Sequence, residues 1–314
     1  MNILSLFDGM SCGRIAAERA GIEVDKYYAS ELDKYAITVT QANWPETIQL
    51  GDVTKWREWN IDWASIDLLI GGSPCQGFSF AGKQLAFDDP RSALFFEYLN
   101  ILNHIKSVNP DVKFMLENVK MKKEYLDVIS SLLGVQPVFI NSALVSAQNR
   151  KRYYWANWEL GQPEDKGIIL SGILEKESDN FVFMSDKFIA RQAGRKCLRD
   201  DFTGKAVNLS AMEYVKNGGQ GDYFLVMTPR GNNAGGARAL DGKTPTLTSN
   251  SWQDNFHVTN DLKSYRKPTP VECERLQTVP DNYTNHVSNT QRYKMLGNGW
   301  TVDVIAHIFK SIKE

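Results

Sequence analysis

Short apolar runs alternate with helical patterns over residues 1–155 of the chain. The clearest helix is expected over Ser92–Val108, where apolar side chains recur on one face, and it ends before Asn109-Pro110 because proline disfavours further helix. Strand–helix alternation predicts an α/β fold: a mostly parallel, Rossmann-like sheet with helices on both faces. The runs that predict strands are Ile3–Phe7, Tyr27–Leu32, Leu68–Gly72, Phe114–Val119 and Phe139–Leu144.

The pattern changes near Trp158. Residues 160–262 show weak periodicity and many Gly, Asn, Asp, Thr and Ser residues, with short strands expected at Ile168–Leu174 and Phe181–Met184. Helical patterns return later, in Pro270–Leu276 and Val302–Ile312. We therefore expect a catalytic domain over 1–158, a smaller irregular domain over 159–262, and a segment over 263–314 that returns to the first domain.

Composition narrows the class of protein. Of 314 residues, 42% are hydrophobic and 23% charged, which is typical of a folded globular chain. No stretch approaches the ~20 apolar residues that span a membrane, and Met1–Asp8 lacks a basic leader, so a cytoplasmic protein is expected. The net charge of −1 neither favours nor excludes nucleic acid. The four cysteines are too widely spaced for a disulfide framework or a metal-binding pair, so no metal is expected.

Polar and glycine residues stand at the ends of the first three predicted units. Phe7-Asp8-Gly9 begins a strand–turn–helix junction, Glu31 follows the second strand, and Asp52-Val53 follows the third unit. Ligands bind beyond the carboxyl ends of parallel strands, where such acids hold ribose hydroxyls or an adenine amino group. Each acid alone could instead cap a helix. Together they favour an adenosine-type cofactor, and the spacing does not distinguish NAD from S-adenosylmethionine (SAM).

Three further segments carry candidate chemistry. Cys75 follows Gly71-Gly72-Ser73-Pro74 at the end of the strand expected over Leu68–Gly72, where the glycines and proline argue against burial and favour a nucleophile. Glu117 lies at the carboxyl end of the next strand. In the run 147–152, alternate residues Gln148, Arg150 and Arg152 would share one side of an extended chain, which could also be a solvated basic edge strand.

These segments, taken in order, resemble the cytosine-5 DNA methyltransferase family over the whole chain. Two departures from the commoner family pattern, Asp-Gly-Met-Ser-Cys-Gly and Gly-Asn-Gly-Trp, lean toward its de novo branch and suggest a phage or prokaryotic enzyme of that subgroup. The matching signatures are Phe-x-Gly at 7–9, Pro-Cys-Gln at 74–76, Glu-Asn-Val at 117–119, Gln-x-Arg-x-Arg at 148–152 and Gly-Asn at 297–298.

The resemblance implies a DNA (cytosine-5-)-methyltransferase that uses SAM as methyl donor and releases S-adenosylhomocysteine. It implies that the thiolate of Cys75 adds to C6 of a flipped-out cytosine, that Glu117 supplies a proton near N3, that Arg152 binds O2, and that Arg150 helps to hold the base and the catalytic loop. No side chain is identified as the base that removes the C5 proton. The cofactor-binding residues it implies are Phe7, Gly9, Glu31, Asp52, Val53, Pro74, Leu94 and Asn298.

The irregular segment fits the position of a target-recognition domain. Lys187–Lys205 holds six basic and two acidic residues and is expected to contact phosphates, whereas the glycine-rich Arg230–Asn250 is expected to read bases. Residues 77–91 are expected to close over the DNA. The residues expected to contact DNA are Gln76, Ser79, Lys83, Gln148, Arg195, Lys196, Arg230 and Arg238.

Three alternatives stay open at this point. An RNA (tRNA) cytosine-5 methyltransferase shares the same motifs, and the insert of about 100 residues favours duplex DNA. A catalytically silent subunit is disfavoured by intact Cys75, Glu117 and Arg152, and a dehydrogenase by the Pro-Cys-Gln motif. The expected partner is double-stranded DNA, with no membrane and a monomer as the working expectation. The sequence does not give the recognition site or say whether a restriction enzyme accompanies the protein.

Overall fold

The computed structural model describes most of the chain outside its central segment. The described residues are 1–73, 93–175, 182–183, 198–199, 206–207, 224–227, 236–238, 243–249, 256–259 and 264–312. Within them, no helix is both long and apolar enough to cross a bilayer.

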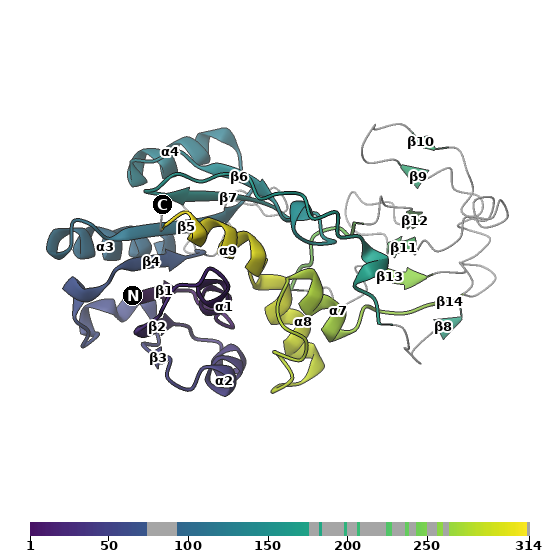
Figure 1. Cartoon of the computed structure of the whole chain (residues 1–314), viewed down its shortest axis with the longest axis horizontal. Helices are drawn as coiled ribbons and strands as arrows, with labels where there is room; N and C mark the ends of the chain where they lie inside the picture. The colour runs from purple at the N-terminus through teal and green to yellow at the C-terminus, as the bar shows by residue number, and fades with distance from the viewer. Residues whose placement is uncertain are drawn as a thin grey trace.

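A seven-stranded sheet forms the centre of the described structure (Figure 1), in the order β3-β2-β1-β4-β5-β7-β6. Its neighbours pair in parallel from β3 to β5, and β7 runs antiparallel to both β5 and β6. The mostly parallel α/β sheet expected from the sequence is therefore confirmed. The strands are β1 (Asn2–Leu6), β2 (Lys26–Ser30), β3 (Ile48–Gln49), β4 (Leu68–Gly71), β5 (Lys113–Val119), β6 (Val138–Asn141) and β7 (Lys151–Ala156).

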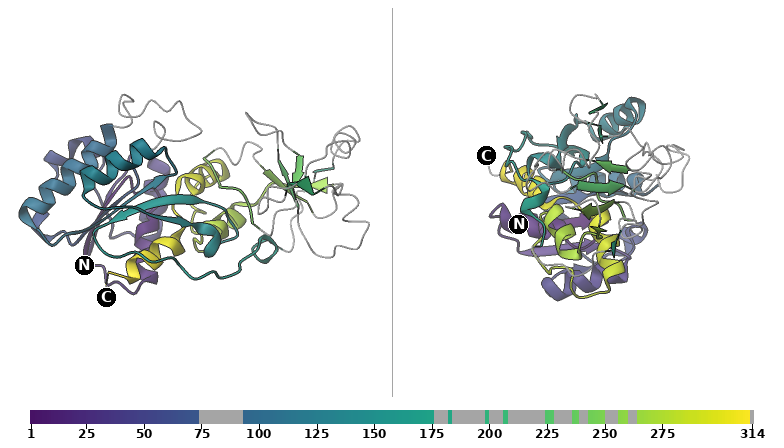
Figure 2. Two further views of the ribbon diagram at one scale, coloured as in Figure 1. Left: turned by 90° about the horizontal axis from the view of Figure 1, so that it is seen from above. Right: turned by 90° about the vertical axis from the view of Figure 1, so that its right-hand side faces the viewer.

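Alternate side chains of the strands enter two separate cores, one on each face of the sheet. Ile3 lies in a cluster with residues of α1 (Cys12–Arg19), α2 (Lys34–Asn43) and α9 (Val302–Lys310). Its neighbour Leu4 lies in a second cluster with α3 (Ala93–Val108) and α4 (Lys123–Leu133). In the left view of Figure 2, α3 and α4 lie on one side of the sheet and α9 on the other. Burial on both faces explains why these strands read as continuous apolar runs.

Short 3-10 helices connect several of these elements. They are η1 (Val53–Glu58), η2 (Trp63–Ser65), η4 (Ser142–Leu144) and η5 (Leu170–Gly172). The last one corrects the strand expected over Ile168–Leu174. Leu170, Ile173 and Leu174 are buried in the first core cluster, so the apolar run marks burial without strand pairing.

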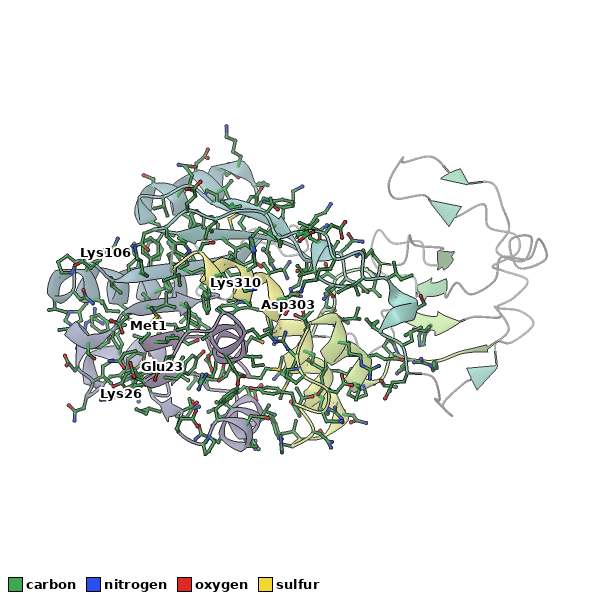
Figure 3. All side chains as sticks on the ribbon, in the orientation of Figure 1. Met1, Glu23, Lys26, Lys106, Asp303 and Lys310 are labelled. Atoms are coloured by element: carbon green, nitrogen blue, oxygen red, sulfur yellow. The ribbon has the colours of Figure 1, made fainter. Side chains whose placement is uncertain are left out.

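The C-terminal helices α7 (Pro270–Leu276), α8 (Asn289–Asn298) and α9 follow one another. α9 packs on α1 at the other end of the sequence. Asp303 of α9, labelled in Figure 3, pairs with Arg19 of α1 at 2.7 Å and with Lys166 at 2.7 Å. These contacts attach the last helix to the first, while the division into three domains stays a prediction.

Small antiparallel strands lie between residues 182 and 265. They pair as β9 with β10, β11 with both β12 and β13, and β8 with β14. β8 is shorter than the strand expected over Phe181–Met184. The bounds are β8 (Val182–Phe183), β9 (Leu198–Arg199), β10 (Ala206–Val207), β11 (Phe224–Met227), β12 (Gly236–Arg238), β13 (Phe256–Thr259) and β14 (Ser264–Tyr265).

Candidate active site

A cavity of about 350 Å³ lies at the carboxyl edge of the sheet. Because β1, β2, β4 and β5 are parallel, the residues that follow them meet at this edge. Gly297 and Asn298 at the end of α8, with Gly299 and Trp300 in the connection to α9, close another side. Seven residues predicted from the sequence line the cavity together: Phe7, Gly9, Glu31, Glu117, Arg150, Arg152 and Asn298.

The first wall of the cavity is the turn after β1. Phe7, Gly9 and Ser11 all adopt left-handed φ angles between 57° and 61°. The backbone N–H of Gly9 donates to Glu31 Oε2 at 2.7 Å, and the N–H groups of residues 32 and 33 donate to Glu31 Oε1 at 2.7 and 2.8 Å. Glu31 thus ties the first two strand ends together. A Cβ on Gly9 would meet nothing within 4 Å, so its backbone lies open to a ligand.

Asp8 lines the same wall and was not assigned a role from the sequence. Its carboxylate accepts from Tyr27 Oη at 2.7 Å and from the hydroxyl of Ser11. Burial raises the pKa of Asp8 to about 6, against the lowering effect of the hydrogen bonds from Ser11, Ser5 and Tyr27, and the carboxylate of Glu31 raises it further. Asp8 and Glu31 give this wall an acidic character suited to a cation, whereas Asp33, also in the lining, is paired with Lys294 at 2.8 Å.

Cys12 also borders the cavity. Burial raises the pKa of its thiol to about 12, so it stays protonated and unreactive at neutral pH.

The opposite wall is built around Glu117 on β5. Glu117 Oε1 pairs with Nε of Arg152 at 2.8 Å, and Oε2 accepts a hydrogen bond from Nε1 of Trp300 at 3.1 Å. The pair joins neighbouring strands, since β5 and β7 run side by side with Val119 opposite Arg152. Next to it, the buried amide of Asn118 donates to Ser73 Oγ at 3.3 Å. Ser73 is two residues before Cys75 in the sequence.

Arg150 joins two backbone segments at the rim of the cavity. Its guanidinium donates to the carbonyl oxygens of Leu247 at 3.1 Å, Gly297 at 3.3 Å and Gly299 at 2.9 Å. The side chain is only 4% exposed. Arg150 therefore fixes residues 297–299 against the segment around Leu247.

Gln148 departs from its prediction as a DNA contact. Its side chain is fully buried, its amide donates to Leu276 O at 3.1 Å and Gln277 Oε1 at 3.3 Å, and its carbonyl accepts from the N–H of Leu247 at 2.8 Å. A buried side chain with these partners joins the C-terminal helices to the 244–247 segment and does not face DNA. The alternation of Gln148, Arg150 and Arg152 therefore does not form one exposed surface.

Three predicted cofactor residues lie outside the lining of the cavity. Asp52 caps η1, and the backbone N–H and hydroxyl of Thr54, at 2.9 and 2.8 Å, lower its pKa. The side chain of Val53 is buried in the second core cluster, and Leu94 packs against that cluster. The capping alternative stated for the acids therefore describes Asp52 well.

Several predicted residues lie beyond the described part of the chain. Arg238 belongs to β12, but its side chain is not described. Among the described residues, no group of three His, Cys, Asp or Glu residues could hold a metal ion. The predicted residues outside the described ranges are Pro74, Cys75, Gln76, Ser79, Lys83, Arg195, Lys196 and Arg230.

Asp8 and Trp300 are two cavity residues to which the sequence analysis gave no role, although both lie inside motifs that it noted. Asp8 is the variable position of Phe-x-Gly, and Trp300 ends the Gly-Asn-Gly-Trp run. Both were noted as departures from a family pattern. A residue that differs from the common family pattern inside a binding motif was the signal that could have predicted a contact particular to this chain.

Comparisons with known proteins give a consistent result. The family model described as C-5 cytosine-specific DNA methylase matches residues 1–314. Type II methyltransferase M1.ScrFI of Lactococcus lactis subsp. cremoris is 31% identical over 336 aligned residues, covering 99% of this chain and 78% of that protein. Type II methyltransferase M.HhaI of Haemophilus parahaemolyticus is 28% identical, covering 99% of this chain and 94% of that protein.

Solved structures agree on the fold. Entamoeba histolytica methyltransferase EhMeth superposes with a TM-score of 0.65 at 16% identity, covering 100% of this chain and 99% of the other. Spodoptera frugiperda DNMT2 superposes with a TM-score of 0.62 at 20% identity, again covering 100% and 99%. At these identities the likeness concerns the fold alone.

Proposed function

Because the chain belongs to the C-5 cytosine-specific DNA methylase family and transfers a methyl group from SAM to C5 of cytosine in DNA, we propose that this reaction takes place in the cavity at the carboxyl edge of its sheet. One observation carries the proposal: the Glu31-tied loop and the Glu117–Arg152 pair border the same cavity of about 350 Å³. A cofactor on one wall and a base on the other would then meet without any further rearrangement of these walls.

The acidic wall fits SAM. The carboxylates of Asp8 and Glu31 suit a ligand with a sulfonium and an ammonium group, and the open backbone at Gly9 admits it closely. Leu32, 69% exposed beside Glu31, offers apolar surface to an adenine ring. When bound, SAM supplies an electrophilic methyl group. Phe7, Gly9, Glu31 and Asn298 are the residues we propose to hold it, with Glu31 on the ribose.

Four other cofactor residues are proposed on the resemblance alone. Pro74 lies outside the described residues. Asp52 has one oxygen committed to Thr54, so its second oxygen is the one left for an adenine amino group. The side chains of Val53 and Leu94 pack in the core or against it, which leaves the Val53 backbone as the group to meet the cofactor.

The proposed chemistry begins with the thiolate of Cys75. It forms a bond to C6 of cytosine, which moves the ring electrons so that C5 becomes nucleophilic and takes the methyl group. The C5 proton then leaves to a base, the electrons of that bond restore the C5–C6 double bond, and the thiolate is released. The cysteine is therefore regenerated in each cycle.

Glu117 and Arg152 are proposed to act on the same base. Attack at C6 moves negative charge toward N3 and O2, so a proton that passes by way of Glu117 to N3 and the cation of Arg152 at O2 stabilise the addition. Their contact at 2.8 Å holds both groups on adjacent strands facing the cavity. Arg150 is proposed to act through the loop that it holds.

A cytosine stacked in duplex DNA cannot reach such a cavity, so we propose that the base is flipped out, at a cost of a few kcal/mol. Gln76, Ser79 and Lys83 are proposed near the flipped nucleotide. Arg195 and Lys196 are proposed on phosphates, and Arg230 and Arg238 on base edges.

The test uses duplex DNA carrying 5-fluorocytosine at the target position. Fluorine cannot leave C5 as a proton would, so wild-type protein with SAM should form a complex that survives denaturant, and Cys75→Ala should form none while it still binds SAM. Labelled SAM with normal duplex DNA and with tRNA, run in parallel, identifies the substrate. Methyl transfer by Cys75→Ala, or transfer by wild type to tRNA alone, would overturn the proposal.

An RNA substrate receives less support, because the family model that matches the whole chain is that of a DNA methylase. A paired restriction enzyme, a phage source, a monomeric state and a cytoplasmic location stay predictions.

A further inference from the structure

Trp300 lies in a short loop that is held from several directions. The carbonyl oxygen of Gly299 accepts from Arg150 Nη2 at 2.9 Å and from Gln277 Nε2 at 3.3 Å. On the other side, the hydroxyl of Thr301 donates to Gln277 Oε1 at 2.9 Å. Because both flanking residues are bonded by buried side chains, the backbone at Trp300 has little freedom, and its ring is directed by the loop.

The indole ring reaches Glu117, 183 positions earlier in the chain. Its Nε1–H donates to Glu117 Oε2 at 3.1 Å, while Oε1 is paired with Arg152. An indole nitrogen can only donate a hydrogen bond, so the oxygen of Glu117 must be the acceptor in this contact. The two oxygens are thus each fixed by one donor, which sets the plane of the carboxylate. A carboxylate offers about four acceptor positions, so each oxygen keeps capacity toward the cavity that Glu117 borders.

Gly72 leaves room for this contact. A Cβ at Gly72 would lie 2.9 Å from Glu117 Oε2 and 2.9 Å from Trp300 Nε1. Any larger residue would push the donor and acceptor apart. Gly72 directly follows β4 and is three positions before Cys75 in the sequence. The same glycine is therefore next to the Trp300–Glu117 hydrogen bond and close in the chain to the proposed nucleophile.

We infer that Trp300 is a positioning residue: its indole N–H orients the Glu117 carboxylate beside the cytosine ring, so that a proton which the carboxylate takes up from solvent can pass to N3. The inference rests on the proposed function, in which Glu117 acts at N3. Trp300 itself does not transfer a proton. Its ring borders the cavity, so the role through Glu117 has to be separated from a wall contact with the cofactor.

The test replaces Trp300 by Phe, which keeps an aromatic ring and removes the N–H. Hydrogen bonds to charged groups are worth about 1.5–3 kcal/mol, so kcat should fall about 10-fold or more. The KM for SAM should stay within about twofold. Trp158→Phe is the matched control, because Trp158 packs against the same core and loses one indole bond, to Ile308 O at 3.2 Å, away from the cavity. It should leave kcat unchanged.

A double-mutant cycle separates this inference from the proposed function. In a Glu117→Ala background, measured by single turnover on duplex DNA, adding Trp300→Phe should lower the rate no further, because the group that it orients is gone. Gly72→Ala, which keeps Trp300, should also lower kcat in the wild-type background. A full 10-fold loss from Trp300→Phe in the Glu117→Ala background, or a raised KM for SAM with normal kcat, would overturn the inference and leave the proposed function standing. Failure of wild type to methylate duplex DNA would overturn the proposed function itself.

Discussion

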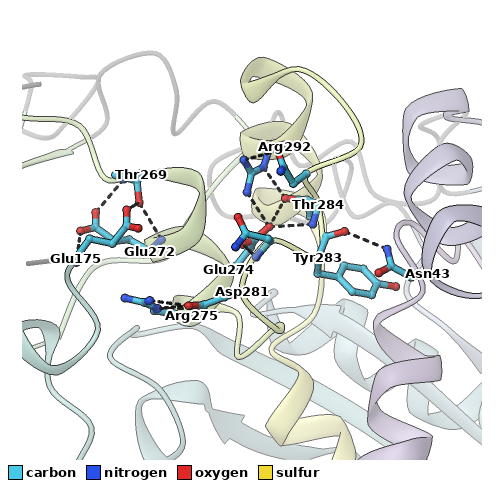
Figure 4. A network of polar contacts seen from close by, with 12 residues as sticks. Asn43, Glu175, Thr269, Glu272, Glu274, Arg275, Asp281, Tyr283, Thr284 and Arg292 are labelled. Atoms are coloured by element: carbon cyan, nitrogen blue, oxygen red, sulfur yellow. Dashed lines mark hydrogen bonds and ion pairs between the residues drawn. The ribbon is translucent and has the colours of Figure 1, made fainter. Parts of the chain in front are cut away.

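Two regions of the molecule contain buried glutamates paired with arginines, and their surroundings differ. On α7, Glu272 and Glu274 are fully buried. Figure 4 shows the polar contacts of Glu274. Glu274 accepts from the backbone of Asn282 and Thr284, from the Thr284 hydroxyl and from Arg292. At the cavity, Glu117 has two donors among the described residues, Arg152 and Trp300.

Glu272, the other glutamate of α7, also has all of its acceptor positions occupied by donors. Glu272 accepts two bonds from Arg266, at 2.6 and 2.7 Å, one from the N–H of Glu175 and one from the N–H of Thr269. The last belongs to a capping box that starts α7. The neighbouring turn reaches α2, where Asn43 donates to Tyr283 O at 3.0 Å.

The difference shows that a glutamate–arginine pair can either stabilise the fold or contribute to a binding site. A carboxylate whose acceptor positions are all used offsets the cost of its burial and can bind nothing else. Glu117 borders a cavity and keeps free acceptor capacity, so a substrate group can join it. The number of hydrogen-bond donors around each glutamate, more than its burial, distinguishes the structural glutamates of α7 from Glu117 at the cavity.

Glu117→Gln is the largest expected effect on activity. Positioned acid–base groups contribute about 10²- to 10⁴-fold to rate, so single-turnover methylation of duplex DNA should fall by that factor. Gln keeps the shape of the side chain and an acceptor for Trp300, but it leaves Arg152 without its counter-ion. The free energy of unfolding in urea should therefore fall, by less than the loss expected for Glu272→Gln, because Arg152 borders the cavity. Wild-type rates in this variant would place Glu117 with the structural glutamates.

Glu272→Gln should show the opposite profile. Removing one partner of a buried pair costs about 3–5 kcal/mol, because Arg266 keeps its charge without a counter-ion. Denaturant unfolding measures the loss, and methylation per folded molecule, measured at low temperature with SAM in excess, should stay within about twofold. A stable but inactive Glu272→Gln protein would contradict the comparison.

Asp8→Asn tests the acidic wall through pH. The pKa of Asp8 is raised to about 6, so its native form binds a proton more tightly than the unfolded chain does. That contribution to stability is present below about pH 4 and is lost as the pH rises through about 6. In the absence of SAM, Asp8→Asn should remove this slope and be stabilised relative to wild type at pH 8 by up to about 3 kcal/mol. Parallel pH slopes for the two proteins would show that Asp8 does not titrate there.

Asp52→Ala is the smallest expected effect. Loss of the cap on η1 should cost about 1 kcal/mol of folding stability, with the KM for SAM rising less than about threefold. Glu31→Ala is the comparison, because Glu31 lines the cavity and its loss should raise that KM about 10-fold or more. Equal effects of the two substitutions on the KM for SAM would indicate that Asp52 binds the cofactor as Glu31 does.

Several elements followed directly from the sequence. The expected strands at Ile3–Phe7 and Phe114–Val119 agree with β1 and β5 to within one residue at each end, and Pro270–Leu276 is α7. Periodicity succeeds here because burial on a strand or helix is a local property of spacing. It failed over Ile168–Leu174, since burial of a short apolar run does not require strand pairing.

The sequence by itself determined the family, the parallel sheet and the edge at which Phe7, Glu31 and Glu117 meet, because parallel strands direct their carboxyl ends to one side. Only the tertiary structure decided that Gln148 is buried against Leu276 and that Trp300 reaches Glu117. Such contacts join side chains more than a hundred residues apart, and their partners depend on how separately encoded helices and strands pack. The spacing of apolar residues along the chain predicts which face of each helix or strand is buried. It does not predict how those elements pack against one another.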